Sequence, residues 1–66
     1  MLYQLIIKRS DLMKTVKVIE PKVKAFEFSA QIKQVFFTFE VSDAQMDHIR
    51  GRLQKAEIGC RVSKWN

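Results

Sequence analysis

The run from Val35 to Val41 constrains the fold more than any other part of the chain. Side chains of a β-strand point alternately to its two faces, so Phe37 and Phe39 share an unbroken apolar face with the two end residues. Thr38 falls on the opposite, more polar face together with Phe36 and Glu40. The pattern predicts a strand that rests one face on a hydrophobic core.

A helix is predicted to begin directly after this strand. Ser42 followed three residues later by Gln45 is typical of a capping box, and Val41 and Met46 are spaced for a hydrophobic staple. Apolar residues then recur on a narrow stripe at helical spacing, namely Met46, Ile49, Leu53 and Ala56. We therefore expect an amphipathic helix over about residues 43–56. Gly59 is placed either to end this helix or to start the next strand.

The remaining segments are predicted to supply the other strands. Residues 2–8 are apolar on both faces, which favours a central strand. Residues 15–20 alternate until Pro21 interrupts the ladder, and the apolar parity of residues 22–29 changes near Ala25 as it would at a β-bulge. Ser10 and Asp11 favour a loop or a single helical turn before residue 15. A last strand is predicted over residues 58–65, with Ile58, Cys60 and Val62 on its apolar face.

Together these elements predict an α+β fold. We expect a mainly antiparallel sheet of four to five strands, with one amphipathic helix at about residues 43–56 packed on one face. A chain of 66 residues with 47% hydrophobic content fits one small domain over residues 1–66. So small a core is also compatible with a homodimer.

The sequence gives little support to an enzyme. The chain has one histidine, one cysteine and two glycines, which excludes a cysteine-based zinc site and a Gly-rich phosphate loop. His48 is expected to be solvated, and Cys60 to be a small buried hydrophobe. No nucleophile, base and orienting group occur together in any motif. We therefore expect no catalysis, no metal and no cofactor.

Hydropathy and cysteine content bear on the compartment. No apolar run approaches the roughly 18 to 20 residues of a membrane span, and no secretory signal pattern is present. The lone Cys60 suits a reducing environment. We expect a cytoplasmic protein with no membrane partner, of the size common among stand-alone phage and mobile-element proteins.

The charge balance favours an acidic partner. Twelve Lys and Arg residues face seven Asp and Glu residues, giving a net charge of +5. The first hypothesis is a non-enzymatic module that contacts nucleic acid through basic side chains with an aromatic contribution. Its predicted binding residues are Arg50, Arg52, Lys55, Arg61, Lys64, Trp65, Phe36 and Lys17.

The alternative hypothesis is a protein-binding regulator or inhibitor of phage or mobile-element type. It would dock an exposed sheet edge or an aromatic patch on a larger host protein or complex. Its partner would be an acidic protein surface rather than a nucleic acid. The sequence leaves both hypotheses open, because Trp65 and Phe36 are as well suited to packing as to stacking on bases.

Overall fold

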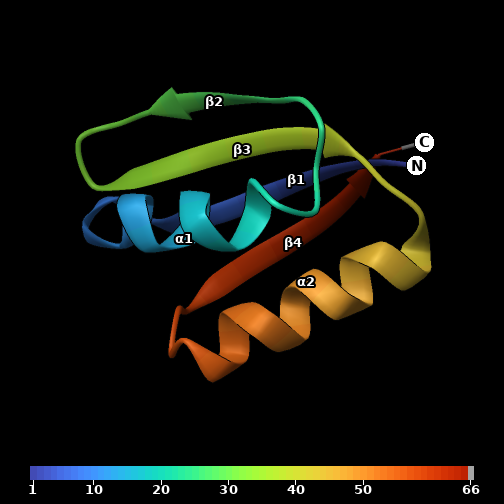
Figure 1. Ribbon diagram of the computed structural model, residues 1–66. Helices are drawn as coiled ribbons and strands as arrows, with labels where there is room; N and C mark the ends of the chain where they lie inside the picture. Colours follow the sequence, from blue (N-terminus) through green and yellow to red (C-terminus); the bar gives the residue numbers. More distant parts are fainter. Residues whose placement is uncertain (66) are drawn as a thin grey trace.

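A computed structural model describes residues 1–65, which form a β-α-β-β-α-β succession (Figure 1). The elements are β1 (Leu2–Lys8), η1 (Arg9–Asp11), α1 (Leu12–Ile19), β2 (Phe26–Ala30), β3 (Gln34–Glu40), α2 (Asp43–Lys55) and β4 (Cys60–Trp65). The four strands make one antiparallel sheet in the order β2-β3-β1-β4, the ferredoxin-like arrangement. The predicted α+β class is confirmed.

Both helices lie on the same side of the sheet, and the opposite side has no helix over it (Figure 1). Tyr3, Leu5 and Ile7 of β1 face the helices and are buried, as are Val35, Phe37 and Phe39 of β3. The helices and connections complete this core with Ile19, Val23, Val41, Met46, Ile49, Leu53 and Ile58. β1 lies between β3 and β4, which confirms the central position predicted from its two apolar faces. No helix within residues 1–65 is long and apolar enough to cross a membrane.

The prediction of a strand over residues 15–20 is wrong, because this segment belongs to α1. Thr15 and Ile19 are fully buried, four residues apart on one helical face, whereas Val16 and Val18 are only partly buried. The Thr15 hydroxyl donates a hydrogen bond of 2.8 Å to the carbonyl of Asp11, so burial leaves it satisfied. The fold therefore has a second helix where only one was expected.

Pro21 follows a helix and does not interrupt a strand. The amide of Glu20 still donates to the carbonyl of Val16, and the chain then leaves α1 through a turn that buries Val23. The parity change near Ala25 is no bulge, since β2 begins only at Phe26 and Val23 belongs to the connection. From Phe26 onward the register is continuous, with Phe26 and Phe28 packed against the ring of Phe37.

The start of α2 agrees with the sequence. The Gln45 amide donates to the Ser42 hydroxyl at 3.2 Å, and the Ser42 amide donates to Gln45 Oε1 at 3.0 Å. Val41 and Met46 are both buried in the one core, where the predicted staple places them. The capping box and the helix over about residues 43–56 are confirmed, with the last helical residue at Lys55.

At the end of α2, Glu57 and not Gly59 reverses the chain, and Gly59 directly precedes β4, the other place predicted for it. Glu57 has φ 59°, in the left-handed region. Its amide donates to Gln54, and the amide of Ile58 donates to Leu53 at 3.0 Å, which is a Schellman motif. Burial of both Ile58 and Leu53 supplies the apolar contact that accompanies this motif. Glu57 therefore adopts a left-handed backbone conformation, which costs a residue with a Cβ atom about 1 to 2 kcal/mol relative to the right-handed conformation.

We expect the substitution Glu57→Gly to raise the free energy of unfolding by about 1 kcal/mol. Glycine adopts the left-handed conformation without the Cβ clash, although its greater freedom in the unfolded chain offsets part of the gain. Urea denaturation followed by circular dichroism measures the change. Gly59→Ala is the matched control, since open space surrounds the added Cβ and its φ is not left-handed. A midpoint that falls in Glu57→Gly would contradict the prediction.

Candidate functional site

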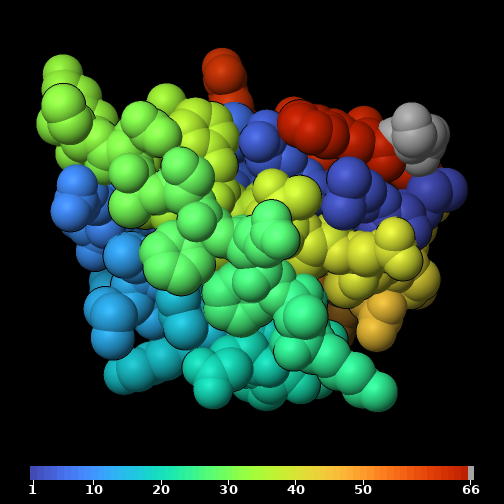
Figure 2. Space-filling view, turned by 90° about the horizontal axis from the view of Figure 1, so that it is seen from above, coloured from blue at the N-terminus to red at the C-terminus, as the bar shows by residue number. Residues whose placement is uncertain are grey.

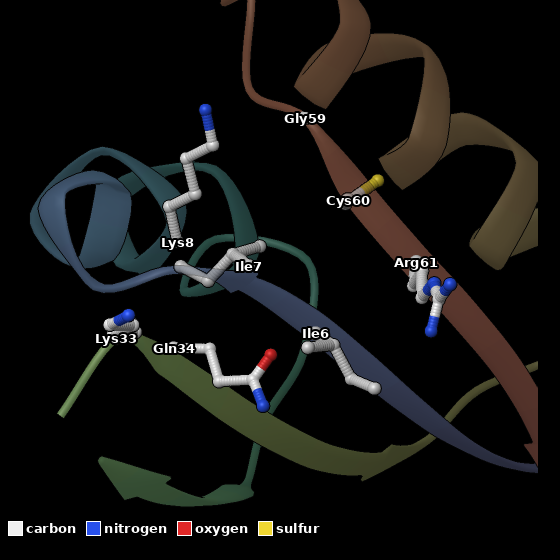
Figure 3. Close-up of a pocket in the computed structure, with 8 residues that line it drawn as sticks. All are labelled: Ile6, Ile7, Lys8, Lys33, Gln34, Gly59, Cys60 and Arg61. Carbon is white, nitrogen blue, oxygen red and sulfur yellow. The ribbon is translucent and has the colours of Figure 1, made fainter. Parts of the chain in front are cut away.

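A basic pocket lies at the end of the sheet where β1 finishes and where β3 and β4 begin (Figure 3). Its volume is about 300 Å³. The lining residues come from β1, from the β2–β3 hairpin with the start of β3, and from the start of β4: Ile6, Ile7, Lys8, Lys33, Gln34, Gly59, Cys60 and Arg61. Three of these side chains carry positive charge, so the pocket is suited to an anion.

The strand register explains how the charged residues come together. Lys8 pairs with Gln34, and Ile6 pairs with Arg61, so all four lie on the sheet face that no helix covers. Lys8 and Arg61 are diagonal neighbours on adjacent strands, at about 7 to 8 Å between backbones. Lys33 immediately precedes Gln34 in the hairpin. Residues 25 or more positions apart in sequence are thereby gathered at one edge.

The hairpin that supplies Lys33 is held in place by Arg9. The Arg9 amide donates to the carbonyl of Lys33 at 3.2 Å, and its guanidinium donates to the carbonyl of Gln31 at 3.1 Å. Arg9, which directly follows Lys8, therefore holds the hairpin through its backbone amide at Lys33 and through its side chain at Gln31. Lys33 itself remains exposed.

The cations of the basic pocket have no carboxylate partner. Across residues 1–65 the one ion pair within 4.0 Å joins Lys64 to Asp43, at the other end of the sheet. Lys8, Lys33 and Arg61 are all exposed. Uncompensated positive charge in a concave site raises the local concentration of anions. The basic pocket is lined by three cations and no carboxylate.

Cys60 is exposed at the sheet edge, which contradicts the prediction that it is buried. It pairs with Ile7 and so lies on the helix side, as its parity predicted. β4 is an edge strand, however, so no further strand covers its outer side. Partial burial of its thiol raises the pKa of Cys60, which disfavours the thiolate that a nucleophile needs.

A second polar cluster joins the start of α2 to the sheet. The Tyr3 hydroxyl donates to Asp43, and Lys64 Nζ lies 3.2 Å from the other carboxylate oxygen. The hydrogen bond from Tyr3, and after it that from Lys64, lowers the pKa of Asp43. The same hydrogen bond to Asp43, and after it burial, raises the pKa of Tyr3. These contacts fix a helix to two strands, and we assign the cluster a structural role.

The residues predicted for nucleic-acid contact do not form one surface. Arg50, Arg52 and Lys55 are exposed on α2, and Lys17 is exposed on α1 instead of on a strand. Phe36, Arg61 and Trp65 lie on the uncovered sheet face, where Phe36 and Arg61 flank Ile6. Trp65 pairs with Leu2 at the far end, and Lys64 faces the helix side and binds Asp43. The predicted set is thus divided among α1, α2, the uncovered sheet face and the helix side of β4.

Two of the pocket cations were missed by the sequence reasoning. Lys8 ends a strand and Lys33 precedes one, and neither position is part of a charged motif. The signal that could have revealed them is their position along the strands. When two strands pair antiparallel, a cation at the end of one lies beside a cation at the start of the other. Recognising it requires the strand order. No group of three or more His, Cys, Asp or Glu residues within residues 1–65 could hold a metal ion.

Comparison with known proteins relates the chain to signalling proteins by fold. No protein-family model and no curated protein sequence matches it. A solved structure described as a PII-like signalling protein from Thermus thermophilus matches with a TM-score of 0.72 at 12% identity, over 94% of this chain and 80% of that one.

Two structures of CPII, a nitrogen regulatory PII-like protein from Thiomonas intermedia K12, also match. The form bound to ADP, AMP and bicarbonate has a TM-score of 0.76 at 8% identity, over 94% of this chain and 80% of that one. The apo form has a TM-score of 0.75 at 8% identity, with 94% and 84% covered. At such identities the likeness shows a shared fold.

These findings contradict the nucleic-acid-binding hypothesis. The matched structures are regulatory signalling proteins, one of them with nucleotides and bicarbonate bound, and not nucleic-acid-binding modules. The separation of the predicted residues onto different surfaces gives the physical reason, because net charge alone does not reveal how cations are distributed. The phage or mobile-element origin has no support from these structures, whereas a regulatory role agrees with them better.

Proposed function

We propose that this chain is a small cytoplasmic regulator that binds a phosphate-bearing nucleotide and acts on a partner protein without catalysing a reaction. The single observation that carries the proposal is the basic pocket with three cations and no carboxylate partner. Lysine and arginine are the residues that bind phosphate oxygens, arginine in bidentate geometry. The nucleotides and bicarbonate bound to CPII are anions of the kind that such a pocket suits.

The neighbouring sheet face offers a place for a base. Phe36 is partly buried and lies directly across from Ile6, which also lines the basic pocket. Stacking of a base on an aromatic ring contributes about 1 to 3 kcal/mol. A second hollow of about 370 Å³ continues the face beyond Phe36, and its other lining residues are Gln4, Glu27, Phe28, Ser29 and Thr38. A nucleotide with its phosphate on the cations would extend its base toward these residues.

We expect ADP or AMP to bind the wild-type protein, and Arg61→Ala to weaken that binding roughly tenfold or more. Hydrogen bonds between charged groups contribute about 1.5 to 3 kcal/mol, and 1.4 kcal/mol corresponds to a factor of ten in affinity. Isothermal titration calorimetry with ADP, AMP and bicarbonate measures the effect. Weaker binding at higher salt is expected, because the cations are exposed.

Arg52→Ala is the matched control for this experiment. It removes the same charge and side chain from α2, where the residue is exposed and outside the basic pocket. We expect its nucleotide affinity to equal that of the wild type. The proposal fails if neither nucleotide binds at low salt, or if Arg52→Ala weakens binding as much as Arg61→Ala.

A further inference from the structure

The outer edge of β2 is an open, apolar strand edge. β2 is the last strand on its side of the sheet, and Figure 2 looks down on this edge, with β2 and the hairpin in green and residues 12–24 in blue to cyan beside them. Phe28 is 56% exposed although its ring packs at 5.9 Å from that of Phe37. Met13 of α1 and Ile32 of the hairpin are 69% and 89% exposed. Soluble proteins normally protect such an edge with charge, proline or a covering element.

The backbone groups that point outward on β2 follow from the hairpin. The Gln31 amide donates to the carbonyl of Gln34 at 2.7 Å, which makes these two residues a hydrogen-bonded pair. Bonded and non-bonded pairs alternate along an antiparallel ladder. With Phe28 opposite Phe37 and Ala30 opposite Val35, both residues fall in non-bonded pairs. The amides and carbonyls of Phe26, Phe28 and Ala30 therefore face away from β3 and are free to pair with another strand.

Charge around the β2 edge selects the kind of strand that would add there. Residues 9–32, a range that leaves out the basic-pocket lysines Lys8 and Lys33, hold five Lys and Arg residues against three Asp and Glu residues, a net charge of +2. None of these cations forms an ion pair within the described part of the chain. Pairing with a second copy would bring two such basic regions together at a cost, whereas an acidic segment would neutralise them.

We infer that the β2 edge is the docking surface for an extended acidic segment of a partner protein, which adds to the sheet as a fifth strand. Its backbone pairs with Phe28 and Ala30, its alternate apolar side chains contact Phe28, and its carboxylates face the lysines of α1 and of the connection to β2. This inference rests on the proposed function insofar as a regulator requires a surface for its target. It uses none of the residues that line the basic pocket.

The test uses the full chain and a fluorescein-labelled peptide in which glutamate and valine alternate. We expect the peptide to bind, as measured by fluorescence anisotropy, and the equivalent lysine–valine peptide not to bind. On addition of the glutamate peptide, the amides of Phe28 and Ala30 gain protection from hydrogen exchange, while the amide of Gln31, already bonded to Gln34, does not change.

The key variant is Ala30→Pro, which removes an outward donor and no hydrogen bond of the β2–β3 ladder. Proline is tolerated at such edge positions, so the variant is expected to fold, and circular dichroism checks this. Affinity for the glutamate peptide should fall by about tenfold or more. Ala30→Val, which keeps the donor, is the matched control and should bind as the wild type does.

The inference would be overturned if the two peptides bound equally well, or if Ala30→Pro had no effect on binding. It would also be overturned if sedimentation showed a wild-type dimer that Ala30→Pro dissociates, and the glutamate peptide did not bind. The last result would assign the edge to a second copy of the chain. Arg61→Ala is expected to bind the glutamate peptide normally. If the peptide binds but nucleotides do not, the proposed function fails and the docking inference stands. If nucleotides bind but the peptide does not, only the docking inference fails.

Discussion

Replacing Phe37 with alanine is expected to lower the free energy of unfolding by about 3 to 5 kcal/mol, the range found for large aromatic side chains removed from a core. Phe37 is fully buried in the middle of β3, and the rings of Phe26 and Phe28 pack on it from β2. Domains of this size have total stabilities near the lower end of about 5 to 15 kcal/mol. The variant should be largely unfolded or close to it at room temperature.

Phe36→Ala provides the control, because it removes the same side chain from the next position and the opposite face. Phe36 is partly buried on the uncovered face, so its loss should cost only about 1 kcal/mol. Urea denaturation monitored by far-ultraviolet circular dichroism compares the two. An equal or larger loss in Phe36→Ala would mean that the core lies on the other face of the sheet.

The second large effect concerns α1. Lys17→Pro is expected to destabilise the protein by about 3 kcal/mol, because proline removes a helical hydrogen bond and clashes with the carbonyl four residues earlier. Lys17 is exposed and makes no ion pair within residues 1–65, so the loss would come from the backbone alone. Circular dichroism should also report lower helix content.

Lys17→Ala is the control that distinguishes a helix from a strand. Alanine is the best helix former and a poor strand former, so the free energy of unfolding should stay constant or rise slightly if α1 is helical. A clear loss of stability in Lys17→Ala would restore the strand predicted for residues 15–20, because alanine disfavours a strand but not a helix.

The parts of the fold predicted correctly are those in which local signals agree. β3 has one period of alternation over its full length, and the Ser42 capping box marks the start of α2 by backbone chemistry that needs no distant partner. The central position of β1 was predicted from apolar residues on both faces, and on the uncovered face Leu2 and Ile6 are partly buried between side chains of β3 and β4.

The segment that became α1 lacks such agreement. Val16 and Val18 fit alternation, while Leu12, Thr15 and Ile19 fit helical spacing, and eight residues are too few for periodicity to decide. β-branched residues favour strands locally, and the choice was made by tertiary packing that buries Thr15 and Ile19 against the sheet. Local propensity could not reveal a preference that is created by the rest of the molecule.

The candidate site shows the same division. Arg61 was identified because β4 alternates clearly, and its place on the uncovered face was predicted. Lys8 and Lys33 were not, because their proximity depends on β1 lying between β3 and β4, which no local pattern encodes. The wrong choice of nucleic acid as partner has the same origin, since a total charge carries no information about where the charges meet.

The pairing of Leu2 with Trp65 has a practical consequence for experiments on this chain. The first and last strands begin and end side by side, about 20 Å along β1 from the basic pocket (Figure 1). A label, tag or surface tether attached through either end would emerge at the same pole and leave the basic pocket and the hairpin tip unobstructed. A circular permutant could join these two ends and open the chain at the β2–β3 hairpin. The strand order of the sheet would stay the same, but Lys33 would lie at a new chain end.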